Sequence, residues 1–582
     1  MFSVRSTAAC TLGALLATAS IGTAQTAGTS PALPGSAKIA AGATSELPLK
    51  YTGKPTTEEI SAADLMTRLY IFADDSMMGR QVGTRYNLMG TAYIEREVRR
   101  MGLQPAGDNG GYFQNLPLYT YYVDSATSVS VGAEKLVISN DFLPIATDER
   151  RITLEGVPVV YGGSSNDSTT WLSGDDMAGK VVVINGSGVL LPNSPTLRSR
   201  VARAALIFVV SLDRVPAMQK PSAMRRQSLQ RDGAPPPPTP TVLISQRVAT
   251  LLFGALDSAK AGAVGHPLTG AIVLRKEQAP GRNVVAILPG ADAQLKGEYV
   301  AIGAHNDHIG FNNHPVDHDS IRALNLVARP QGADSPPPGK LTDDQIARIR
   351  TMTDSLHALH GARVDSINNG ADDDGSGTVS VLEIAESFAA AKTRPRRSII
   401  FVWHAGEEAG LWGSEFFTDH PTVPRDSIVA QLNMDMVGRG AAADVTGESK
   451  TGELLHGGTG YLQLVGSRRL STELGDLMES VNTKGKFGFT FDYGMDANGH
   501  PQNIYCRSDH YEYARYGIPI VFMTTGGHSD YHQVTDEPQY IDYAHMAEIA
   551  RFVKDAATTV ANLDHRVVVD KPKPDPKGRC VQ

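Results

Sequence analysis

Apolar residues along this chain of 582 residues follow two different patterns. Between residues 281 and 562, short β-branched runs alternate with longer stretches of helical periodicity. Between residues 128 and 274, short β-like runs follow one another with turn residues between them, as at residues 157–161, 180–184 and 205–210. Alternating strands and helices predict an α/β fold, a mostly parallel mixed sheet sandwiched by helices. The succession of short strands predicts a separate β-rich module inserted into that fold.

Four of the predicted strands end close to residues that commonly bind metals. They are His305 after residues 299–304, Glu407 and Glu408 after residues 398–402, Asp435 after residues 427–434, and His532 after residues 518–523. An acidic, glycine-rich loop at residues 369–377 adds Asp373 at the start of a helical pattern. Open α/β sheets bind ligands at the carboxyl ends of their strands. We therefore expect these side chains to converge on one site.

The types of these residues indicate the metal. Neighbouring residues at a strand end point in different directions, so one glutamate of the pair can hold a metal while the other faces the water that the metal activates. The remaining set of two histidines and three carboxylates, without cysteine, suits zinc in an open catalytic site better than structural zinc. Five ligands exceed the need of one tetrahedral ion, so two zinc ions sharing one carboxylate fit the set better. For the Glu407–Glu408 pair taken alone, two solvated acids at a helix N-terminus remain an equally good interpretation, because the helix dipole favours acids there.

The motifs resemble those of the secreted co-catalytic di-zinc exopeptidases. This family comprises bacterial leucine-type aminopeptidases, with glutamate carboxypeptidases and glutaminyl cyclases as relatives. Its His-x-Asp motif matches residues 305–307, its Gly-x-x-Asp-x-x-Ser-Gly motif residues 370–377, its Glu-Glu pair residues 407–408, its Asn-x-Asp-Met motif residues 433–436, and its final Tyr-His residues 531–532. The motifs occur in the expected order from about residue 295 to 545.

The resemblance implies a role for each residue. His305 and Asp435 would hold one zinc ion, Glu408 and His532 the other, and Asp373 would bridge them. Three further residues would act in catalysis: Glu407 as the general base, Tyr531 as a hydrogen-bond donor to the oxyanion, and Asp307 as the acceptor that orients His305. The implied activity is removal of N-terminal residues from peptides.

One departure from the family pattern affects the surroundings of the site. His305 and Asp373 are 68 positions apart, whereas family members usually keep these residues close together. The extra segment, residues 311–367, contains one predicted amphipathic helix with Ile346, Ile349 and Met352 on its apolar side. It is interpreted either as a surface excursion or as a flap over the site. Its histidines, His314, His318, His357 and His360, are expected on the surface.

The remaining segments complete the predicted organisation. Residues 1–24 have the pattern of a secretory signal peptide, with Arg5, an apolar stretch at residues 8–21 and small residues before a cut at Gln25. The other predicted boundaries are a mobile lead-in at 25–50, an N-terminal part of the peptidase domain at 51–126, an inserted module at 127–278 that resembles the protease-associated domain, the catalytic domain at 279–565 and a tail at 566–582. Cys506 and Cys580 remain after removal of the signal and form a candidate disulfide.

These observations predict a secreted or periplasmic zinc aminopeptidase with peptide substrates and no stable membrane anchor. The net charge of −8 and the absence of a basic block argue against nucleic-acid partners. A carboxypeptidase of the same superfamily remains an alternative, since Arg507 lies close in sequence to the site and could receive a substrate carboxylate. A catalytically silent binding ectodomain should have lost a ligand or the base, and all six residues are present. The sequence leaves the side-chain preference and the oligomeric state open.

Overall fold

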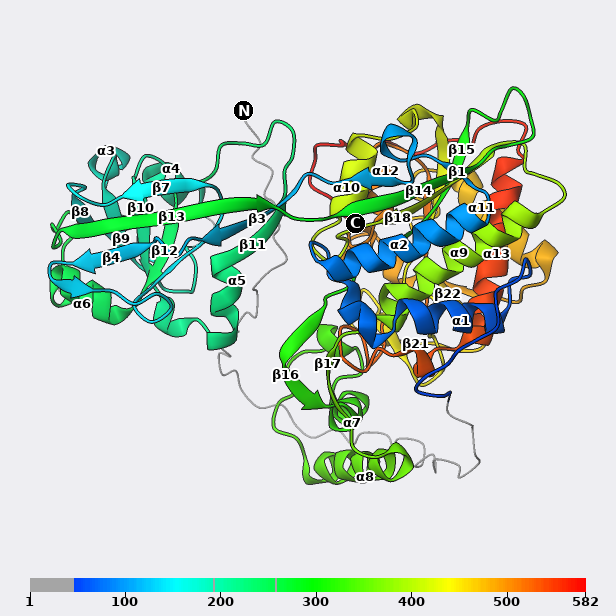
Figure 1. Cartoon of the computed structure of the whole chain (residues 1–582), viewed down its shortest axis with the longest axis horizontal. Helices are drawn as coiled ribbons and strands as arrows, with labels where there is room; N and C mark the ends of the chain where they lie inside the picture. Colours follow the sequence, from blue (N-terminus) through cyan, green and yellow to red (C-terminus); the bar gives the residue numbers. More distant parts are fainter. Residues whose placement is uncertain (1–46, 192–193, 257–258) are drawn as a thin grey trace. The chain divides into compact units, whose positions relative to one another are not determined.

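The computed structural model describes residues 47–191, 194–256 and 259–582. The chain forms two compact units. One contains the chain up to Leu116 together with Gly281–Gln582, and the other is Pro117–Pro280 (Figure 1). The predicted signal peptide and nearly all of the predicted lead-in lie outside the described residues.

The larger unit is organised around a mixed sheet of nine strands in the order β1-β14-β18-β15-β19-β24-β22-β23, with β2 also paired to β14. The strands are β1 (Gln104–Pro105), β2 (Phe113–Asn115), β14 (Arg282–Leu288), β15 (Tyr299–His305), β18 (Ser398–His404), β19 (Ile428–Met434), β22 (Tyr461–Val465), β23 (Thr490–Asp492) and β24 (Ile520–Thr524). The four adjacent strands β18, β15, β19 and β24 are parallel, whereas β14 and β22 run antiparallel to their neighbours β18 and β24. The predicted fold class is confirmed.

Helices cover both faces of this sheet. One face packs against α1 (Ala62–Phe72), α2 (Arg85–Arg100), α9 (Gly377–Ala390), α11 (Thr472–Gly485) and α13 (Tyr543–Ala561), and the other against α10 (Trp412–Asp419) and α12 (His510–Ala514). Along β18, Ile399, Phe401 and Trp403 enter the first core, while Ile400 and Val402 enter the second. Successive side chains of a strand point to opposite faces, so a strand buried on both faces reads as the continuous apolar run seen in the sequence.

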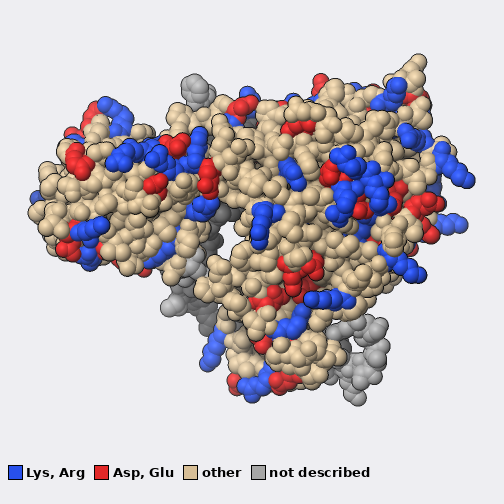
Figure 2. All heavy atoms as spheres, in the orientation of Figure 1, with Lys and Arg blue, Asp and Glu red and all other residues tan. Residues whose placement is uncertain are grey.

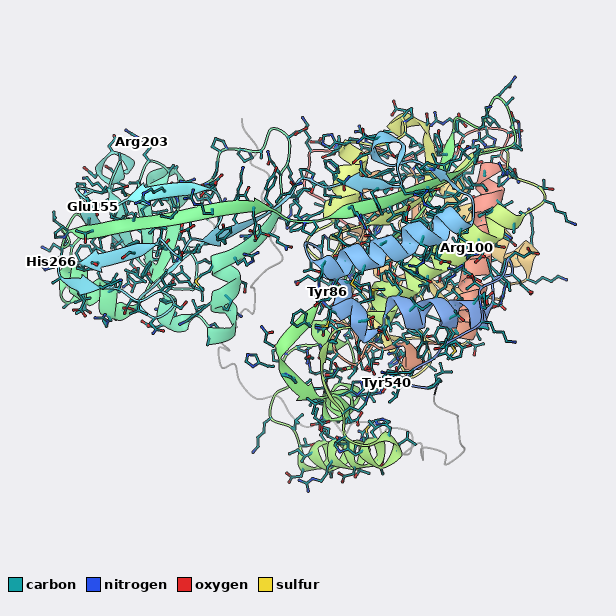
Figure 3. All side chains as sticks on the ribbon, in the orientation of Figure 1. Tyr86, Arg100, Glu155, Arg203, His266 and Tyr540 are labelled. Carbon is teal, nitrogen blue, oxygen red and sulfur yellow. A yellow bond between two sulfur atoms is a disulfide. The ribbon has the colours of Figure 1, made fainter. Side chains whose placement is uncertain are left out.

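A buried ion cluster joins three helices of the first layer. Arg68 of α1 is almost fully buried, and its guanidinium contacts Glu383 at 2.8 Å, Glu97 at 3.0 Å and also Glu386. Arg100, labelled at the end of α2 in Figure 3, contacts Glu386 at 2.7 Å. These groups link α1, α2 and α9 where the helices pack on the sheet.

The segment between His305 and Asp373 folds into more elements than the sequence predicts. Strand β16 (Phe311–Asp317) pairs antiparallel with β17 (Val364–Ile367), and between them lie α7 (His318–Ala328), a short 3-10 turn, η7 (Gly332–Asp334), and α8 (Asp343–His360). Helix α8 is the predicted amphipathic helix; it has a capping box and no fully buried residue. The hairpin and α7 escaped prediction because β16 is largely polar and exposed, so its sequence lacks the alternation of a half-buried strand. In Figure 1, α8 lies outermost, beyond α7.

The C-terminal tail returns to the larger unit. Cys580 forms a disulfide with Cys506, at a sequence separation of 74, as hypothesised. The side chain of Gln582 accepts a hydrogen bond from the backbone N–H of Tyr505 at 3.0 Å and donates one to the carbonyl of Met495. The tail is irregular in structure, and these contacts hold its end in place.

The smaller unit contains two sheets. One has the order β6-β12-β10-β9-β8, and the other the order β11-β3-β13-β4-β5 with β7 beside β13. Their bounds are β3 (Leu118–Val123), β4 (Ser128–Val131), β5 (Glu134–Lys135), β6 (Phe142–Pro144), β7 (Arg150–Thr153), β8 (Val159–Ser164), β9 (Val181–Asn185), β10 (Leu206–Val210), β11 (Arg225–Leu229), β12 (Thr241–Ile244) and β13 (Leu268–Gln278); the helices are α3 (Gly174–Met177), α4 (Pro195–Val201), α5 (Lys220–Met224) and α6 (Gln246–Phe253). The unit begins at Pro117 rather than near residue 127, because β3 pairs with both β11 and β13.

Charged side chains of both signs are interspersed on the face in Figure 2, in line with the modest net charge. Within the described ranges, none of the helices combines the length and apolar composition that crossing a bilayer requires.

Candidate metal centre

Parallel strands bring the predicted ligands to one edge of the sheet. His305 is the last residue of β15, and Asp435 directly follows Met434, the last residue of β19. Glu407 and Glu408 follow the end of β18, and His532 lies on the loop after β24. Because these four strands are adjacent and parallel, their carboxyl ends form a common edge, and the predicted convergence of the side chains is observed.

Asp373 occupies the centre of the site. Its Oδ1 lies 3.1 Å from Nε2 of His305, and its Oδ2 lies 2.9 Å from Nε2 of His532. On the first side, Nε2 of His305 is also 3.6 Å from Oδ1 of Asp435. On the second side, Nε2 of His532 is also 2.9 Å from Oε2 of Glu408. One carboxylate thus faces two separate donor groups, one with each of its oxygens.

The second group contains a histidine that the sequence analysis did not assign. His308 is fully buried, and its Nδ1 lies 2.6 Å from Oε1 of Glu408. Its ring meets that of His532 edge to face, with centroids 5.4 Å apart. Gly370 makes room for this ring: its φ is +57°, and a Cβ there would lie 2.5 Å from Cγ of His308. The signal was its place three residues after His305, in the same segment at the end of a strand.

The donor atoms fit metal ions. Several of them are buried and, although they lie close to one another, form no hydrogen bond, namely Nε2 of His305, both ring nitrogens of His308, Oδ2 of Asp373, Oε1 of Glu408 and Nε2 of His532. Buried polar atoms without partners are costly and rare in folded proteins. Among the described residues, three groups bring one possible ligand atom from each member within 4.8 Å of the others. Two of them lie here: His308, Asp373, Glu408 and His532, and His305, Asp374 and Asp435. The third, His318, Asp365 and Glu537, contains none of the predicted ligands. Nitrogen and oxygen donors without thiolates suit zinc in an open site.

The electrostatics of the site favour added positive charge. Burial alone would lower the pKa of His305, but the carboxylates around it raise that pKa well above its usual range. Burial raises the pKa of Glu407 well above its usual range, and the nearby Asp435 and Glu408 raise it further. Burial would also raise the pKa of Glu408, yet His532 and His308 together bring it down to about 2. Four carboxylates close together in a buried site are stabilised by cations.

Two aspartates hold the backbone around the donors. Oδ1 of Asp307 accepts hydrogen bonds from the N–H groups of Gly406 at 2.7 Å and Glu407 at 3.1 Å. Asp374 accepts the N–H of His305 through Oδ2 at 3.0 Å and the N–H of Gly377 through Oδ1 at 2.8 Å. Because the Asp374 oxygens are used in this way, Asp373 is better placed than Asp374 to contact both groups.

Asp307 differs from its expected role in one detail. Nδ1 of His305 lies 3.1 Å from the backbone carbonyl oxygen of Asp307 and 3.7 Å from its carboxylate. The carbonyl is therefore the nearer acceptor for the ring proton, and the carboxylate positions the start of the Glu407 loop. The other predicted ligand of this group, Asp435, accepts a hydrogen bond through Oδ2 from Oγ of Ser508 at 2.7 Å.

Most of the other histidines lie away from the donors. His404 is buried under the site at the end of β18, as expected, with Nε2 2.9 Å from the hydroxyl of Tyr513. His314 is exposed, as expected. The expectation for His318 is wrong: it is fully buried, with Nε2 2.9 Å from Glu537. Its position at the start of a helix that the sequence did not reveal explains the error.

A pocket opens beside the donors. It has about 690 Å³ of empty space. Asp373, Glu407 and Asp435 line it, and Tyr531 and Arg507 are among the other lining residues. The ring of Tyr531 stacks on that of His532, with centroids 4.0 Å apart. A substrate in this pocket would reach the donors and both predicted catalytic side chains, Glu407 and Tyr531.

Comparisons with known proteins agree with this description. Leucine aminopeptidase 1 of Coccidioides posadasii is 32% identical over 225 residues, covering 35% of this chain and 52% of that protein. Leucine aminopeptidase 1 of Aspergillus fumigatus is 29% identical over 227 residues, with the same coverage of 35% and 52%. The chain thus spans about half the length of these curated relatives.

Two solved structures are similar over most of the chain. An aminopeptidase from Aneurinibacillus sp. strain AM-1 is 16% identical and covers 89% of this chain and 98% of its own, with a TM-score of 0.45. The zinc aminopeptidase BSAP from Bacillus subtilis is 15% identical and covers 86% and 95%, with a TM-score of 0.43.

The family model described as Peptidase family M28 matches residues 283–557. This range contains all the donor residues described above. The candidate metal centre therefore lies within the part of the chain that matches the model of peptidase family M28.

Proposed function

We propose that this chain is an exported aminopeptidase that uses two zinc ions to remove N-terminal residues from peptides. The observation that carries the proposal is the position of Asp373, whose two carboxylate oxygens face His305 on one side and His532 on the other. A carboxylate shared in this way is the arrangement that a pair of metal ions requires.

The two zinc ions have distinct proposed ligand sets. His305 and Asp435 would hold one ion, Glu408, His532 and His308 would hold the other, and both sets would share Asp373. His308 is an addition to the set that the family resemblance implies, and its 2.6 Å approach to Glu408 supports it. When bound, the two zinc ions supply Lewis acidity toward the substrate carbonyl and lower the pKa of a water molecule in the site.

The side chains around the ions have proposed roles in moving protons and holding charge. Glu407 has no oxygen in either donor cluster and lines the pocket, so it is free to take a proton from the attacking water and pass it to the leaving amine. Tyr531 lines the same pocket, and its hydroxyl can donate a hydrogen bond to the oxyanion of the transition state. Carboxylates beside the reacting peptide bond, Glu407 and Asp435, can receive the free amino group of the substrate.

The carboxypeptidase alternative depends on Arg507. In the structure both terminal nitrogens of Arg507 lie 3.1 Å from Oδ2 of Asp334. A guanidinium that is already paired with a carboxylate is less available to a substrate carboxylate. This contact favours the aminopeptidase over the carboxypeptidase.

The export and the inserted unit are further parts of the proposal. The residue pattern of the first 24 positions supports a signal peptide, and the Cys506–Cys580 disulfide supports an oxidising, secreted or periplasmic location. The smaller unit is proposed to be a protease-associated domain, which its β-rich sheets support.

Peptides with blocked ends test the proposed function. The purified full chain should cleave a peptide with a free N-terminus and a C-terminal amide, and N-acetylation should abolish cleavage. Chelation should stop the reaction and zinc should restore it. Cleavage of N-acetylated peptides that C-terminal amidation abolishes would instead establish a carboxypeptidase. No turnover of any free peptide by protein with two zinc ions bound would leave a binding protein that keeps the peptidase fold.

A further inference from the structure

The segment between His305 and Asp373 reaches into the pocket. Gln331, which caps the turn η7, and Asp334, the last residue of the turn, line it together with residues from the strands of the sheet and from the loops after them. Its neighbours on the wall include the apolar side chains of Met495, Ile504 and Phe522. The segment 311–367 therefore supplies part of the surface that a substrate would meet.

The turn η7 is docked on the backbone of Tyr531. The N–H of Ala333 donates to the carbonyl oxygen of Tyr531 at 3.0 Å. Gly332 has a φ of +54°, and a Cβ at this position would lie 2.4 Å from the same oxygen, so a glycine is required for the approach. This contact holds the turn η7 beside Tyr531, which directly precedes His532 in the sequence.

Ion pairs hold the rest of the segment to the same part of the chain. Nη1 of Arg322, on α7, lies 2.6 Å from Oδ2 of Asp530, and its guanidinium stacks 3.4 Å over the ring of Tyr540, which Figure 3 labels. His318, at the start of α7, contacts Glu537 at 2.9 Å. Asp530, Glu537 and Tyr540 flank His532 in sequence, so the same stretch of chain carries the contacts of the segment 311–367 and one of the candidate ligands.

The turn η7 places the carboxylate of Asp334 against the guanidinium of Arg507 on the pocket wall. Oδ2 of Asp334 accepts hydrogen bonds from Nη1 and Nη2 of Arg507, each at 3.1 Å. Nη2 of Arg507 is also 3.5 Å from the hydroxyl of Tyr531. Among the described residues that line the pocket, Arg507 alone is a lysine or arginine. Asp334 therefore neutralises the one fixed positive charge of this wall.

From this contact we infer that Asp334 determines specificity for the side chain that the pocket receives. Apart from the carboxylates of the metal centre and the Asp334–Arg507 pair, the residues that line the pocket are apolar or uncharged, which suits apolar or uncharged N-terminal side chains. Asp334 also repels an acidic side chain that would otherwise pair with Arg507. The inference rests on the proposed aminopeptidase function and names the substrate class for it: peptides whose N-terminal residue is apolar or uncharged.

Substitution of Asp334 by Asn tests this inference. The variant keeps the shape of the side chain and frees the charge of Arg507. For Glu-initiated peptides, we expect kcat/KM to rise about fivefold, the effect of one partly exposed ion pair. For Leu-initiated peptides kcat/KM should stay within about twofold. Asp343→Asn is the matched control, because it makes the same charge change at an exposed position in the same segment. Asp334→Ser serves as a second variant should Asp334→Asn fold poorly.

The double variant Asp334→Asn/Arg507→Met shows whether Arg507 causes the rise in kcat/KM for Glu-initiated peptides. Arg507 is the proposed source of attraction, so the gain for Glu-initiated peptides should disappear in the double variant. A gain that persists there, a gain of equal size in Asp343→Asn, or no gain in an Asp334 variant that still cleaves Leu-initiated peptides would overturn the inference. Failure of the wild-type chain to cleave any free peptide would instead count against the proposed function, and this is seen before a variant is made.

Discussion

Nδ1 of His308 lies 2.6 Å from Oε1 of Glu408, and both side chains face the same group of donors as His532 and Asp373. The contact places a third histidine in the candidate metal centre. It also explains why Gly370 must be a glycine, because a side chain there would collide with the His308 ring.

Replacement of His308 by Ala should weaken one of the two metal sites. Loss of one nitrogen donor from the group around Glu408 and His532 should lower zinc affinity at that site by about 10- to 100-fold or more. Zinc content after dialysis against a weak chelator, measured by elemental analysis, is expected to fall from two ions to one. His314→Ala, at an exposed histidine of the neighbouring segment, should keep both ions. Two tightly held ions in the His308 variant would show that His308 is not a ligand.

Glu407 should be needed for turnover and not for metal binding. Glu407→Gln removes the proton acceptor while keeping the size of the side chain, so kcat is expected to fall by about 10²- to 10⁴-fold. Zinc content should stay at two ions per chain, since Glu407 has no atom in either donor cluster. The Glu453→Gln variant, which makes the same change at an exposed loop residue that does not line the pocket, is the control. A loss of zinc parallel to the loss of rate would instead assign Glu407 to the ligands.

Arg68 should contribute strongly to the stability of the larger unit. Arg68→Met leaves Glu383 buried without its cation, while Glu386 keeps Arg100, and the loss is expected to cost about 3–5 kcal/mol of unfolding free energy at neutral pH. Thermal unfolding followed by circular dichroism measures this loss. Arg99→Met, which removes an exposed arginine paired with Glu95 on the same helix layer, should leave the unfolding midpoint almost unchanged.

The decrease in unfolding free energy caused by Arg68→Met should depend on pH. Burial outweighs the pairing with Arg68 and raises the pKa of Glu383 to about 7, while the pKa of Arg68 lies above its ordinary value, so the guanidinium stays charged. A carboxyl whose pKa is raised on folding is stabilising when protonated, and this contribution is lost as the pH rises through the folded pKa. Without Arg68 the pKa of Glu383 rises further. The variant should therefore lie closer to the wild type at pH 5 than at pH 8, and a pH-independent difference would contradict this reading.

His510 should make the protein less stable in acid. It is fully buried, its ring stacks on Phe522 with centroids 4.6 Å apart, and burial lowers its pKa to about 3. Because the folded state excludes the proton that the unfolded chain binds, stability is lost as the pH falls below the ordinary histidine value near 6.5. The slope is about 1.4 kcal/mol for each pH unit. His510→Phe removes the titration, so its unfolding midpoint should vary less between pH 7 and pH 5 than that of the wild type. Equal slopes would show that the folded state binds a proton at His510 as readily as the unfolded chain does, which would contradict the lowered pKa.

The sequence predicted the parts of the site that local pattern determines. An apolar run followed by His, Asp or Glu indicates the end of a buried strand, and parallel strands bring such ends together, so the grouping of His305, Glu408, Asp435 and His532 could be predicted. His308 was missed because the side of a turn from which a ring projects depends on backbone geometry that one sequence does not display.

The fold of the segment 311–367 could likewise be predicted from the sequence only in part. Helix α8 follows helical periodicity and was predicted, whereas β16 and β17 are held together by their pairing and by ion pairs from residues far along the chain, such as Glu537. The contact of Asp334 with Arg507, which are 173 positions apart, likewise depends on the folded chain.

Anomalous scattering at the zinc edge from crystals of the full chain tests the central claim most directly. We predict two peaks, one between His305 and Asp435 and one among His308, Glu408 and His532, with the Asp373 carboxylate between them. A single peak, or none, in crystals grown with zinc would contradict a two-zinc centre bridged by Asp373.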